Sequence, residues 1–554
     1  MSSFLSRDRI ERGPWFSFER LIQRLLVHYG FSSVTHTGKS NDKGADITCI
    51  DKRGRRVIVQ CKFTIGAGSI GSKAVDELRN ACDWYGTSFG IIATNTGLSD
   101  SCLARMKELS EGGYRLVYWD YNKLVQMGET LDEQASSWLK PWDYQDDAVA
   151  AVFKQFSDGN RALVEMATGL GKTIVMAEVA ARFIREDPSR RILLLAHSLP
   201  LLNQLESSIW SQIGASVPTQ LWRGGEHPLD FEGITVGMFQ SIDSFLRNSN
   251  EDNDIPTFDL VMVDEAHHTP ALSFSRVLEE MGKDKVLGVT ATPWRGDGAR
   301  IEAIFGVPVF KMGILEGMER GFLSDVEYKM YLDDVDWLQV ASCSEKSLTI
   351  SDLNSRLFIP GRDEVMVDSI LREWRERGKP KMLIFCKQEV HARNLQALLN
   401  GVGIPSKVLV SKGTPFPERT RTLMGFRSGE FSNLVAVDLL NEGVDVPDVS
   451  MIVFARVTHS RRIFVQQLGR GLRVADGKER LFVMDFVADI RRVAAGVSLN
   501  RTARRRMVDG VEFYRGRGAE IVNFGEVPHD GFVNEFLADA ADLDDHQRVQ
   551  LNFM

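Results

Sequence analysis

Two neighbouring stretches near the N-terminus bring an acid, an amide and an ammonium group together. Asp46 precedes the apolar run ITCI, Gln60 and Lys62 lie in RVIVQCKF, and the charged turn DKRGR separates the two runs. Alternation along a strand places Gln60 and Lys62 on one face, and a hairpin would bring Asp46 level with Gln60. The Asp46 carboxylate, the Gln60 amide oxygen and the Cys61 carbonyl are oxygen ligands that suit a hard divalent cation. We therefore expect a metal site with Lys62 beside it as a base or charge stabiliser.

A second stretch, MATGLGKT at residues 166–173, has the composition of a phosphate-binding turn. It lies between the apolar run ALVEM and a helical pattern. Backbone N–H groups of such a turn point at phosphates, Lys172 can reach the β and γ groups, and the Thr173 hydroxyl can ligate Mg²⁺. Met166 stands where the strict pattern has a glycine. The remaining residues of the turn with an expected phosphate contact are Thr168, Gly169 and Gly171.

Paired acids end another apolar run, DLVMVDEAHH. Asp264 is suited to hold Mg²⁺, and Glu265 to orient and deprotonate an attacking water. A glycine turn and an unrelated acidic strand end would give the same letters separately. Their occurrence together predicts ATP hydrolysis, with ATP and Mg²⁺ as ligands.

Two arginines in QQLGRGLR can complete such a site. Arg470 and Arg473 are three residues apart, which places them on one face of a helix. Phosphoryl transfer needs positive charge on the departing phosphate, and an arginine from a facing domain supplies it only when the cleft closes. The alternative is a pair of surface arginines on a solvated turn, which would leave the neighbouring Gln and Gly residues unexplained.

The elements that must position these residues form an α/β pattern. PWFSFERLIQRLLVHYGF predicts an amphipathic helix, and the two runs above, FGIIATN and YRLVYWD predict strands, with helices between them. We expect a small α/β domain over residues 1–126. A linker over residues 127–138 follows, because MGETLDEQASSW lacks strong periodicity.

Two further series of strands alternate with helices. The first contains RILLLAHS, GITVGM, DLVMVDE and KVLGVTATP, and the second contains KMLIFCK, NLVAVD, SMIVFA and RLFVMDF. This alternation predicts two consecutive doubly wound domains, at residues 139–325 and 361–490. Residues 326–360 are expected to connect the two domains, and residues 491–554 form a tail with basic and acidic parts.

Composition narrows the class of protein. The chain has 554 residues, 43% apolar and 26% charged, with a formal net charge of −8. This length predicts several domains, and the charge means that any nucleic-acid contact must come from local basic surfaces. No run of about eighteen apolar residues occurs, and the N-terminus carries charge where a secretory signal has an apolar core. We expect a cytoplasmic protein without membrane contact, and the six scattered cysteines suggest no zinc site.

The motor-like part resembles the superfamily 2 helicases and translocases with a DEAH-type motif, and more narrowly the motor subunits of type I and type III restriction systems. The resemblance rests on KPWDYQ, the turn above, LLLAHSLPLLNQ, VGMFQSI, DEAHH, TATP, MLIFCK, LLNEGVDVP and QQLGRGLR, in that order. It implies that Gln145 contacts adenine and that Thr290 and Thr292 couple the nucleotide site to a nucleic-acid track. It also assigns to the second lobe Gly443, Asp445, Gln466, Arg470 and Arg473.

The first 125 residues or so resemble the restriction-endonuclease-like fold, and specifically the Mrr-like nucleases, whose signature is an acid followed by (D/E/Q)xK. The matching parts are Glu19, GADI, QCK and IIATN. Gln60 replaces a carboxylate of the broader pattern, so metal affinity should fall unless Glu19 supplies the missing acid. The resemblance therefore implies a nuclease that uses Mg²⁺, or Mn²⁺ in its place, with one or two ions.

Both resemblances together imply an Mg²⁺-dependent DNA endonuclease coupled to an ATP-driven DNA translocase or helicase. Invader-DNA defence in a prokaryote is the expected setting, with duplex or single-stranded DNA and other defence subunits as partners. A second hypothesis is a repair or remodelling helicase whose first domain binds DNA without cutting it. A third, weaker one is an RNA-directed helicase.

Overall fold

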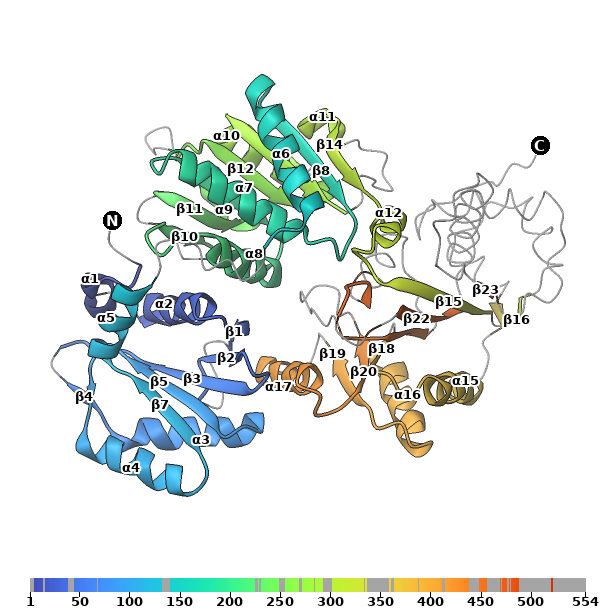
Figure 1. Ribbon diagram of the computed structural model, residues 1–554, viewed down its shortest axis with the longest axis horizontal. Helices are drawn as coiled ribbons and strands as arrows, with labels where there is room; N and C mark the ends of the chain where they lie inside the picture. The colour runs from blue at the N-terminus through green and yellow to red at the C-terminus, as the bar shows by residue number, and fades with distance from the viewer. Residues whose placement is uncertain are drawn as a thin grey trace.

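The structure is a computed structural model of the chain. It describes residues 4–12, 15–37, 44–66, 68–131, 140–224, 228, 231–248, 255–268, 272–282, 284–291, 301–332, 334–335, 358–359, 363–386, 388–410, 414–437, 448–455, 469, 471–475, 478, 480–487 and 520–521. These residues form a first domain and two further lobes, which we call lobe 1 and lobe 2 (Figure 1). The fold is α/β, as the alternating pattern predicts.

The first domain is built on a five-stranded mixed sheet with the order β1-β2-β3-β5-β7. β1–β2 and β2–β3 are antiparallel, whereas β3–β5 and β5–β7 are parallel. Its strands are β1 (Ser32–His36), β2 (Ile47–Ile50), β3 (Arg56–Lys62), β5 (Phe89–Thr94) and β7 (Arg115–Trp119), with a small separate pair of β4 (Ser69–Ile70) and β6 (Gly97–Leu98). Its helices are α1 (Arg7–Arg12), α2 (Trp15–His28), α3 (Ser72–Tyr85), α4 (Asp100–Glu111) and α5 (Tyr121–Thr130).

The hairpin of β2 and β3 forms in the predicted register. Ile47 pairs with Val59, and the turn closes where the Asp51 carboxylate accepts hydrogen bonds from the backbone of Arg53 and Arg55. Val59 packs with the cluster under α2, while the neighbouring Ile58 packs with the cluster under α3. Both faces of β3 are therefore covered by helices, and the predicted alternation between the faces is confirmed.

Two features of the first domain differ from the sequence-based prediction. β1, with the polar sequence SSVTH, is an edge strand that the pattern did not indicate. α5 continues to Thr130, so the start of the predicted linker at residues 127–138 is the last turn of a helix. Asp120 begins this helix by accepting a hydrogen bond from the backbone N–H of Lys123.

Lobe 1 is an all-parallel seven-stranded sheet with the order β10-β11-β9-β12-β13-β8-β14. Its strands are β8 (Arg161–Met166), β9 (Arg191–Ala196), β10 (Thr219–Trp222), β11 (Gly233–Met238), β12 (Leu260–Asp264), β13 (Lys285–Thr290) and β14 (Pro308–Met312). Its helices are α6 (Asp143–Asp158), α7 (Lys172–Glu186), α8 (Leu199–Gln212), α9 (Phe239–Asn248), α10 (Leu272–Met281), α11 (Glu302–Phe305) and α12 (Ile314–Glu319), with a 3₁₀ turn at Ala266–His268. The central strands are fully buried, which explains their unbroken apolar runs.

Lobe 2 is a second all-parallel seven-stranded sheet with the order β19-β20-β18-β21-β22-β15-β23. Its strands are β15 (Asp325–Leu332), β18 (Met382–Cys386), β19 (Lys407–Val410), β20 (Asn433–Val437), β21 (Met451–Ala455), β22 (Arg480–Val487) and β23 (Glu520–Ile521). Its helices are α15 (Asp363–Glu376), α16 (Glu389–Gly401) and α17 (Phe416–Arg427). β16 (Asp334–Val335) and β17 (Phe358–Ile359) form a separate antiparallel pair.

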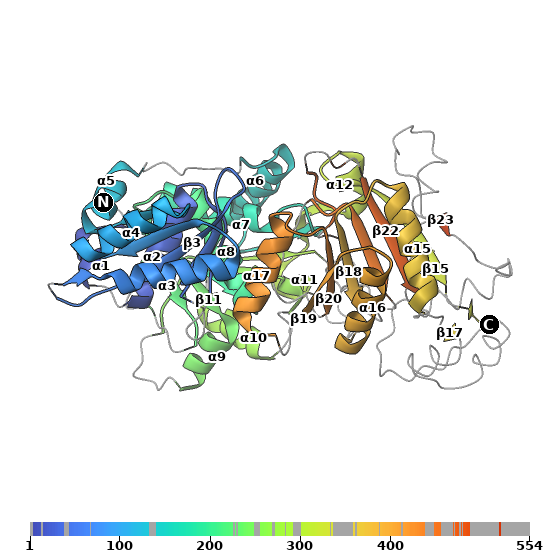
Figure 2. The same cartoon turned by 90° about the horizontal axis from the view of Figure 1, so that it is seen from below.

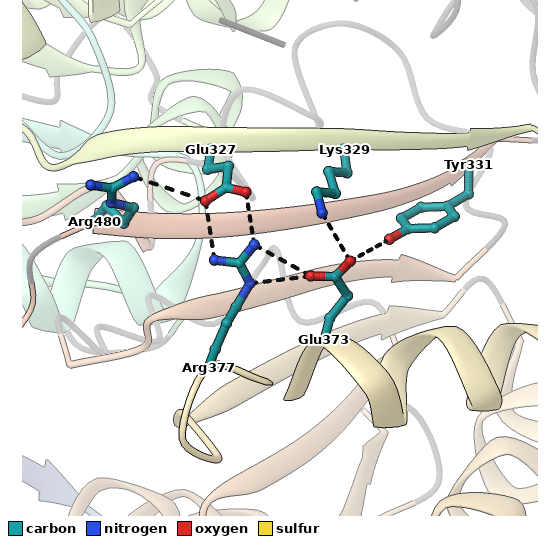
Figure 3. Close-up of polar contacts among 6 residues, drawn as sticks. All are labelled: Glu327, Lys329, Tyr331, Glu373, Arg377 and Arg480. Atoms are coloured by element: carbon teal, nitrogen blue, oxygen red, sulfur yellow. Dashed lines mark hydrogen bonds and ion pairs between the residues drawn. The ribbon is translucent and has the colours of Figure 1, made fainter. Parts of the chain in front are cut away.

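β15 corrects the expectation that residues 326–360 only connect the lobes. It pairs with β22 over its whole length, and its polar residues form a network with α15 (Figure 3). Lys329 forms an ion pair with Glu373 at 2.9 Å, and Glu327 forms one with Arg377 at 2.7 Å. Glu373 is only 3% exposed, so β15 is an integral strand of lobe 2.

The helices of the described residues bury one side each. In α3 the buried residues are Ala74, Val75, Leu78, Ala81, Cys82 and Tyr85, with Glu77 half-buried beside them and Lys73 90% exposed. Gly86 ends this helix in the left-handed conformation, with φ of 66°. Across the described part of the chain, we find no helix with the length and apolar character needed to cross a membrane.

The first domain contacts both lobes (Figure 1, Figure 2). Its α2 packs on α8 of lobe 1, where Arg20 forms an ion pair with Glu206 at 2.6 Å. Arg56 of β3 forms an ion pair at 2.8 Å with Glu430, which follows α17 of lobe 2. Met424 of α17 is also buried against the cluster under α3. The first domain therefore spans the two lobes.

Candidate functional site

Asp46 is fixed opposite the end of β3. Its backbone N–H donates to the Val59 carbonyl at 3.1 Å, and its carboxylate accepts from the Cys61 backbone N–H at 2.6 Å. The hairpin therefore places the acid level with Gln60, at the position that the alternation predicts. The backbone hydrogen bond also stabilises the charged form of the carboxylate.

Glu19 of α2 reaches the same end of β3. The buried Glu19 carboxylate lies 2.5 Å from Nε2 of His36, the last residue of β1. Burial, then the charges of Asp46 and Glu19, raise the pKa of the Cys61 thiol well above its ordinary value. The structure thus brings both predicted acids close to Cys61. Sequence reasoning missed His36, because no pattern indicated its strand.

Gln60 and Lys62 share a partner that the sequence did not indicate. Glu77 of α3 accepts hydrogen bonds from Gln60 Nε2 at 2.9 Å and from Lys62 Nζ at 2.6 Å. Gln60 is 2% exposed, and among the described residues its buried Oε1 has no hydrogen-bond partner. Glu77 of α3 therefore helps to fix the positions of the Gln60 and Lys62 side chains, in addition to the strand that carries them.

The donor set at this end of β3 fits a hard cation. Within the described residues, no group of three or more His, Cys, Asp or Glu side chains is arranged to hold a metal ion. Asp46 and Glu19 lie near Cys61, whereas the Gln60 amide faces α3, and its Oε1 has no hydrogen-bond partner among the described residues. Oxygen-only donors suit Mg²⁺ or Mn²⁺, so Asp46, Glu19 and Gln60 would hold such an ion.

The glycine-rich turn of lobe 1 has the backbone conformation of a phosphate cradle. It joins β8 to the N-terminus of α7, which begins at Lys172. Gly169 and Gly171 have φ of 97° and 77°, and a Cβ on Gly171 would collide with the Gln145 amide. Only glycine therefore fits both positions, and the N-terminus of α7 is open to an anion such as the phosphates of ATP.

The paired acids end β12 next to this turn. Glu265 has φ of 51°, a rare conformation for a residue with a side chain, and its Oε1 lies 3.9 Å from Lys172 Nζ. Burial, then the neighbouring Glu265 charge, raise the pKa of Asp264 to about 7, against the lowering effect of Lys172. Such crowding of two acids beside a lysine is typical of a site that binds a cation.

Glu265 is linked to the end of β13 through a histidine. His267 Nδ1 lies 3.0 Å from Thr290 Oγ1 and 3.3 Å from Glu265 Oε2. His267 is fully buried. Thr290, for which the resemblance implies a coupling role, therefore contacts the paired acids through one side chain. Thr292 lies outside the described residues.

Gln145 holds the turn in this structure. Its Nε2 donates to the Leu170 carbonyl at 2.9 Å, and its Oε1 accepts from the Trp142 backbone N–H at 2.9 Å. The side chain is 2% exposed but lines the cavity beside the turn. Its contact with adenine stays a prediction.

Lobe 2 lies directly against the turn. A Cβ on Gly169 would lie 3.0 Å from Leu323 and 3.3 Å from the Gly469 carbonyl. Arg473 pairs with Leu323 in an isolated bridge and lines the same cavity as Gly171. The site is therefore built from both lobes. The other second-lobe residues of the prediction lie outside the described part of the chain; these are Gly443, Asp445, Gln466 and Arg470.

The cavity at this junction has a volume of about 980 Å³ and three walls. Thr173 and Arg473 line it from the lobes, and Ser33 and His36 line it from β1 of the first domain. His36 thus lies between the nucleotide-side cavity and Glu19.

Three family matches cover most of the chain. Residues 10–128 match the Mrr_cat family, described as restriction endonuclease. Residues 139–295 match the ResIII family, described as the res subunit of type III restriction enzymes, and residues 364–475 match the helicase conserved C-terminal domain. The matches fall on the first domain, lobe 1 and lobe 2 in turn.

Individual relatives are distant. The chain is 26% identical over 357 residues to "Putative ATP-dependent helicase IRC3" of Saccharomyces cerevisiae, which covers 62% of this chain and 51% of that protein. It is 24% identical over 380 residues to the type I restriction enzyme EcoAI endonuclease subunit of Escherichia coli, with 62% and 46% covered. The chain thus spans about half the length of these two relatives.

A solved structure shares the fold over almost the whole chain. The ATP-dependent type ISP restriction-modification enzyme LlaBIII, bound to DNA, aligns with a TM-score of 0.50 and 17% identity over 98% of this chain and 42% of that one. At this identity the likeness concerns the fold alone. The three family matches therefore show that the chain carries an Mrr-like restriction endonuclease domain followed by the two domains of a superfamily 2 helicase.

Proposed function

We propose that the chain couples ATP-driven movement on DNA to Mg²⁺-dependent cleavage of DNA, in a prokaryotic restriction or antiphage system. The matched families supply the coarse classes, a helicase and a restriction nuclease. Among the relatives, EcoAI is a restriction enzyme subunit and LlaBIII is a restriction-modification enzyme bound to DNA. DNA as the nucleic acid, Mg²⁺ as the cation and defence as the setting are carried to this chain by analogy.

The observation that carries the proposal is the position of Asp46. Its carboxylate accepts from the Cys61 N–H, so the acid lies between the two residues of the QxK pair along β3. Glu19 adds a second carboxylate from α2. Asp46, the QxK pair and Glu19 therefore all come from elements that meet near the end of β3, which is what the proposed nuclease site requires.

In the nuclease site, the chain's own groups would orient the scissile phosphate. The Lys62 ammonium supplies positive charge for the developing negative charge on the phosphate. Asp46 and Glu19 supply negative charge for a cation, and Gln60 Oε1 a neutral oxygen. When bound, a divalent cation would lower the pKa of a water molecule and neutralise charge on the phosphate.

In the ATPase site, the glycine turn and Lys172 would hold the phosphates, and Glu265 would orient the attacking water. Lys172 is 3.9 Å from Glu265, so the two charges stabilise each other before nucleotide binds. Asp264 and Thr173 would hold Mg²⁺, which offsets phosphate charge. Arg473, from the facing lobe, would add positive charge only while the lobes are closed.

Separable knockouts test the proposal. Lys172→Ala or Glu265→Gln should lower DNA-stimulated ATP hydrolysis by at least about 100-fold, because each removes a group that acts on the γ-phosphate. Asp46→Ala or Lys62→Ala should lower plasmid cleavage by at least about 100-fold and leave ATP hydrolysis within about twofold. Lys107→Ala, an exposed lysine of α4, is the matched control. If Lys62→Ala cuts as well as the parent, the nuclease assignment is wrong.

One observation favours a second candidate, a helicase whose first domain binds DNA without cutting it. Lys62 already forms an ion pair with Glu77, and the described residues include no three-member His, Cys, Asp or Glu cluster for a metal. Nicking of supercoiled plasmid with Mg²⁺ or Mn²⁺ separates the candidates. Metal-independent DNA binding with no nicking in either metal would favour the second one.

A further inference from the structure

Glu77 is the one acid that contacts both residues of the QxK pair in the described structure. Its Oε2 accepts from Gln60 Nε2 at 2.9 Å and from Lys62 Nζ at 2.6 Å. Glu77 lies on α3, which crosses the face of the sheet that carries Gln60 and Lys62. Because one oxygen joins both side chains, a change at position 77 alters both of them at once.

The first consequence concerns the direction of the Gln60 side chain. A carboxamide is planar, so a hydrogen bond from Nε2 to Glu77 fixes where Oε1 points. Oε1 is buried and has no hydrogen-bond partner. Leaving such an oxygen unpaired costs about 1–3 kcal/mol, and a cation at the strand end is a ligand that it fits. Without Glu77, the amide could turn over and present its nitrogen instead.

The second consequence concerns charge. Gln60 occupies a position at which the broader nuclease pattern has a carboxylate, so the strand itself carries one negative charge fewer. Glu77 restores that charge from the helix. Its carboxylate lies 2.6 Å from Lys62 Nζ, the distance of an ion pair.

The alternative is that Glu77 only forms an ion pair at the surface, without a role at the strand. Lys73 lies one helical turn before Glu77, with 3.9 Å between Nζ and Oε1, but it is 90% exposed. Such an exposed pair contributes about 0–1 kcal/mol and has no bearing on chemistry. The contacts with Gln60 and Lys62 are shorter and less exposed, so Glu77 is directed at the strand and not at Lys73.

We propose that Glu77 is a positioning residue of the nuclease site: it orients Gln60 so that Oε1 faces the cation, and it holds the Lys62 ammonium beside the scissile phosphate. This inference rests on the proposed nuclease function. It is a helix-borne replacement for the carboxylate that the strand lacks.

A charge exchange in the full-length protein tests the inference. Glu77→Ala should lower cleavage by about 30-fold and weaken cation binding by a similar factor, as is typical for residues that orient metal ligands. The double variant Gln60→Glu/Glu77→Gln returns one acid to the strand and keeps an amide on the helix. It should restore cleavage to within about threefold of the parent, whereas Glu77→Gln alone should not.

Cation binding is measured separately from cleavage, by calorimetric titration with Ca²⁺ in the presence of DNA. ATP hydrolysis by the same preparations reports correct folding. Glu108→Gln, which alters an exposed glutamate paired with Arg105 on α4, is the matched control. If Glu77→Ala fails to fold, the isosteric Glu77→Gln and the double variant carry the test.

The outcomes are distinguishable. Loss of cleavage and of Ca²⁺ affinity in Glu77→Gln, with recovery in the double variant, supports the inference. Parental cleavage and Ca²⁺ affinity in Glu77→Gln, while Asp46→Ala is inactive, overturn it and leave the nuclease function intact. Parental cleavage in Asp46→Ala as well would overturn the proposed function itself.

Discussion

The first domain contacts lobe 1 and lobe 2 through surfaces of opposite character. Towards lobe 1, the buried Arg24 of α2 donates to the Gly214 carbonyl at 2.9 Å and the Val217 carbonyl at 3.0 Å. Its guanidinium also lies 4.3 Å from the centre of the Phe4 ring. Phe4 donates its backbone N–H to Ala215, which is itself part of the first domain's apolar cluster. This contact is buried and includes hydrogen bonds to backbone groups.

Towards lobe 2 the contact is more exposed. Arg56 bridges to Glu430 at 2.8 Å and donates to the Ser428 hydroxyl at 2.8 Å, but Glu430 is 41% exposed. Arg421 lies over the Trp84 ring at 5.0 Å. Exposed ion pairs contribute about 0–1 kcal/mol, whereas buried donors and acceptors cost more to separate. The first domain is therefore held more firmly to lobe 1 than to lobe 2.

The largest effect that tests this comparison comes from Arg24→Met. The variant removes the charged donor that bridges the Gly214 and Val217 carbonyls, so the free energy of unfolding should fall by about 3 kcal/mol. Urea denaturation followed by circular dichroism measures it. Arg53→Met, in the exposed hairpin turn, is the control and should change little. A loss as small as the control's would mean that the lobe 1 contact is not the strong one.

A more gradual effect, of about 1.4 kcal/mol for each pH unit, is expected from acid through His28. Its ring stacks on Phe4 at 5.3 Å, and burial, then the charge of Arg24, lower its pKa from 6.5 to about 3. Below pH 6.5 the unfolded chain binds a proton that the folded chain does not, so stability is lost as pH falls towards about 3. The free energy of unfolding should drop by about 1.4 kcal/mol per pH unit in this window.

His28→Gln removes the titrating group and should flatten this dependence. The measurement is urea denaturation at several pH values for both proteins. Since many groups titrate in acid, the comparison rests on the difference in slope between the variant and the parent. Equal slopes would mean that His28 is not held neutral at the contact with lobe 1.

The smallest effect is expected at the lobe 2 contact. Glu430→Gln removes the charge that pairs with Arg56, and the free energy of unfolding should fall by less than about 1 kcal/mol. The loss should shrink further in high salt, because exposed charges are screened. Glu389→Gln, which breaks an exposed pair with Arg393 on α16, is the matched control. A salt-independent loss equal to that of Arg24→Met would contradict the comparison.

The parts of the fold that could be predicted are those with strong periodicity. Apolar runs gave the central strands of both lobes, because strands covered on both faces have no polar positions. Alternation in RVIVQCKF predicted which residues of β3 lie on each face of the sheet, and the hairpin predicted that Asp46 lies level with Gln60. β15 was missed because its sequence, DVEYKMYL, alternates charges that pair with α15, a helix that begins some thirty residues later in the chain.

For the candidate sites too, local sequence patterns predicted some contacts and missed those that depend on the packing of distant elements. Lys172, Asp264 and Glu265 could be predicted to lie close together because they end or follow β8 and β12, parallel strands that end at the same edge of one sheet. Glu77 was not, since its contact with Lys62 depends on the angle at which α3 crosses the sheet. No local spacing encodes that angle, and a glutamate on a helical surface is ordinarily a solvated residue. His36 was missed because its strand is short, polar and at the sheet edge.

Helix α2 connects the end of β3 mechanically to lobe 1. Glu19 and Arg20 are consecutive residues of this helix. Glu19 lies near Asp46 at the end of β3, and Arg20 forms an ion pair with Glu206 of lobe 1. A hydrogen-bonded helix does not bend within one residue. Any rotation of lobe 1 that displaces Arg20 would therefore also displace the Glu19 carboxylate and strain its hydrogen bond with His36. A force on lobe 1 would therefore reach the proposed nuclease site through one helix.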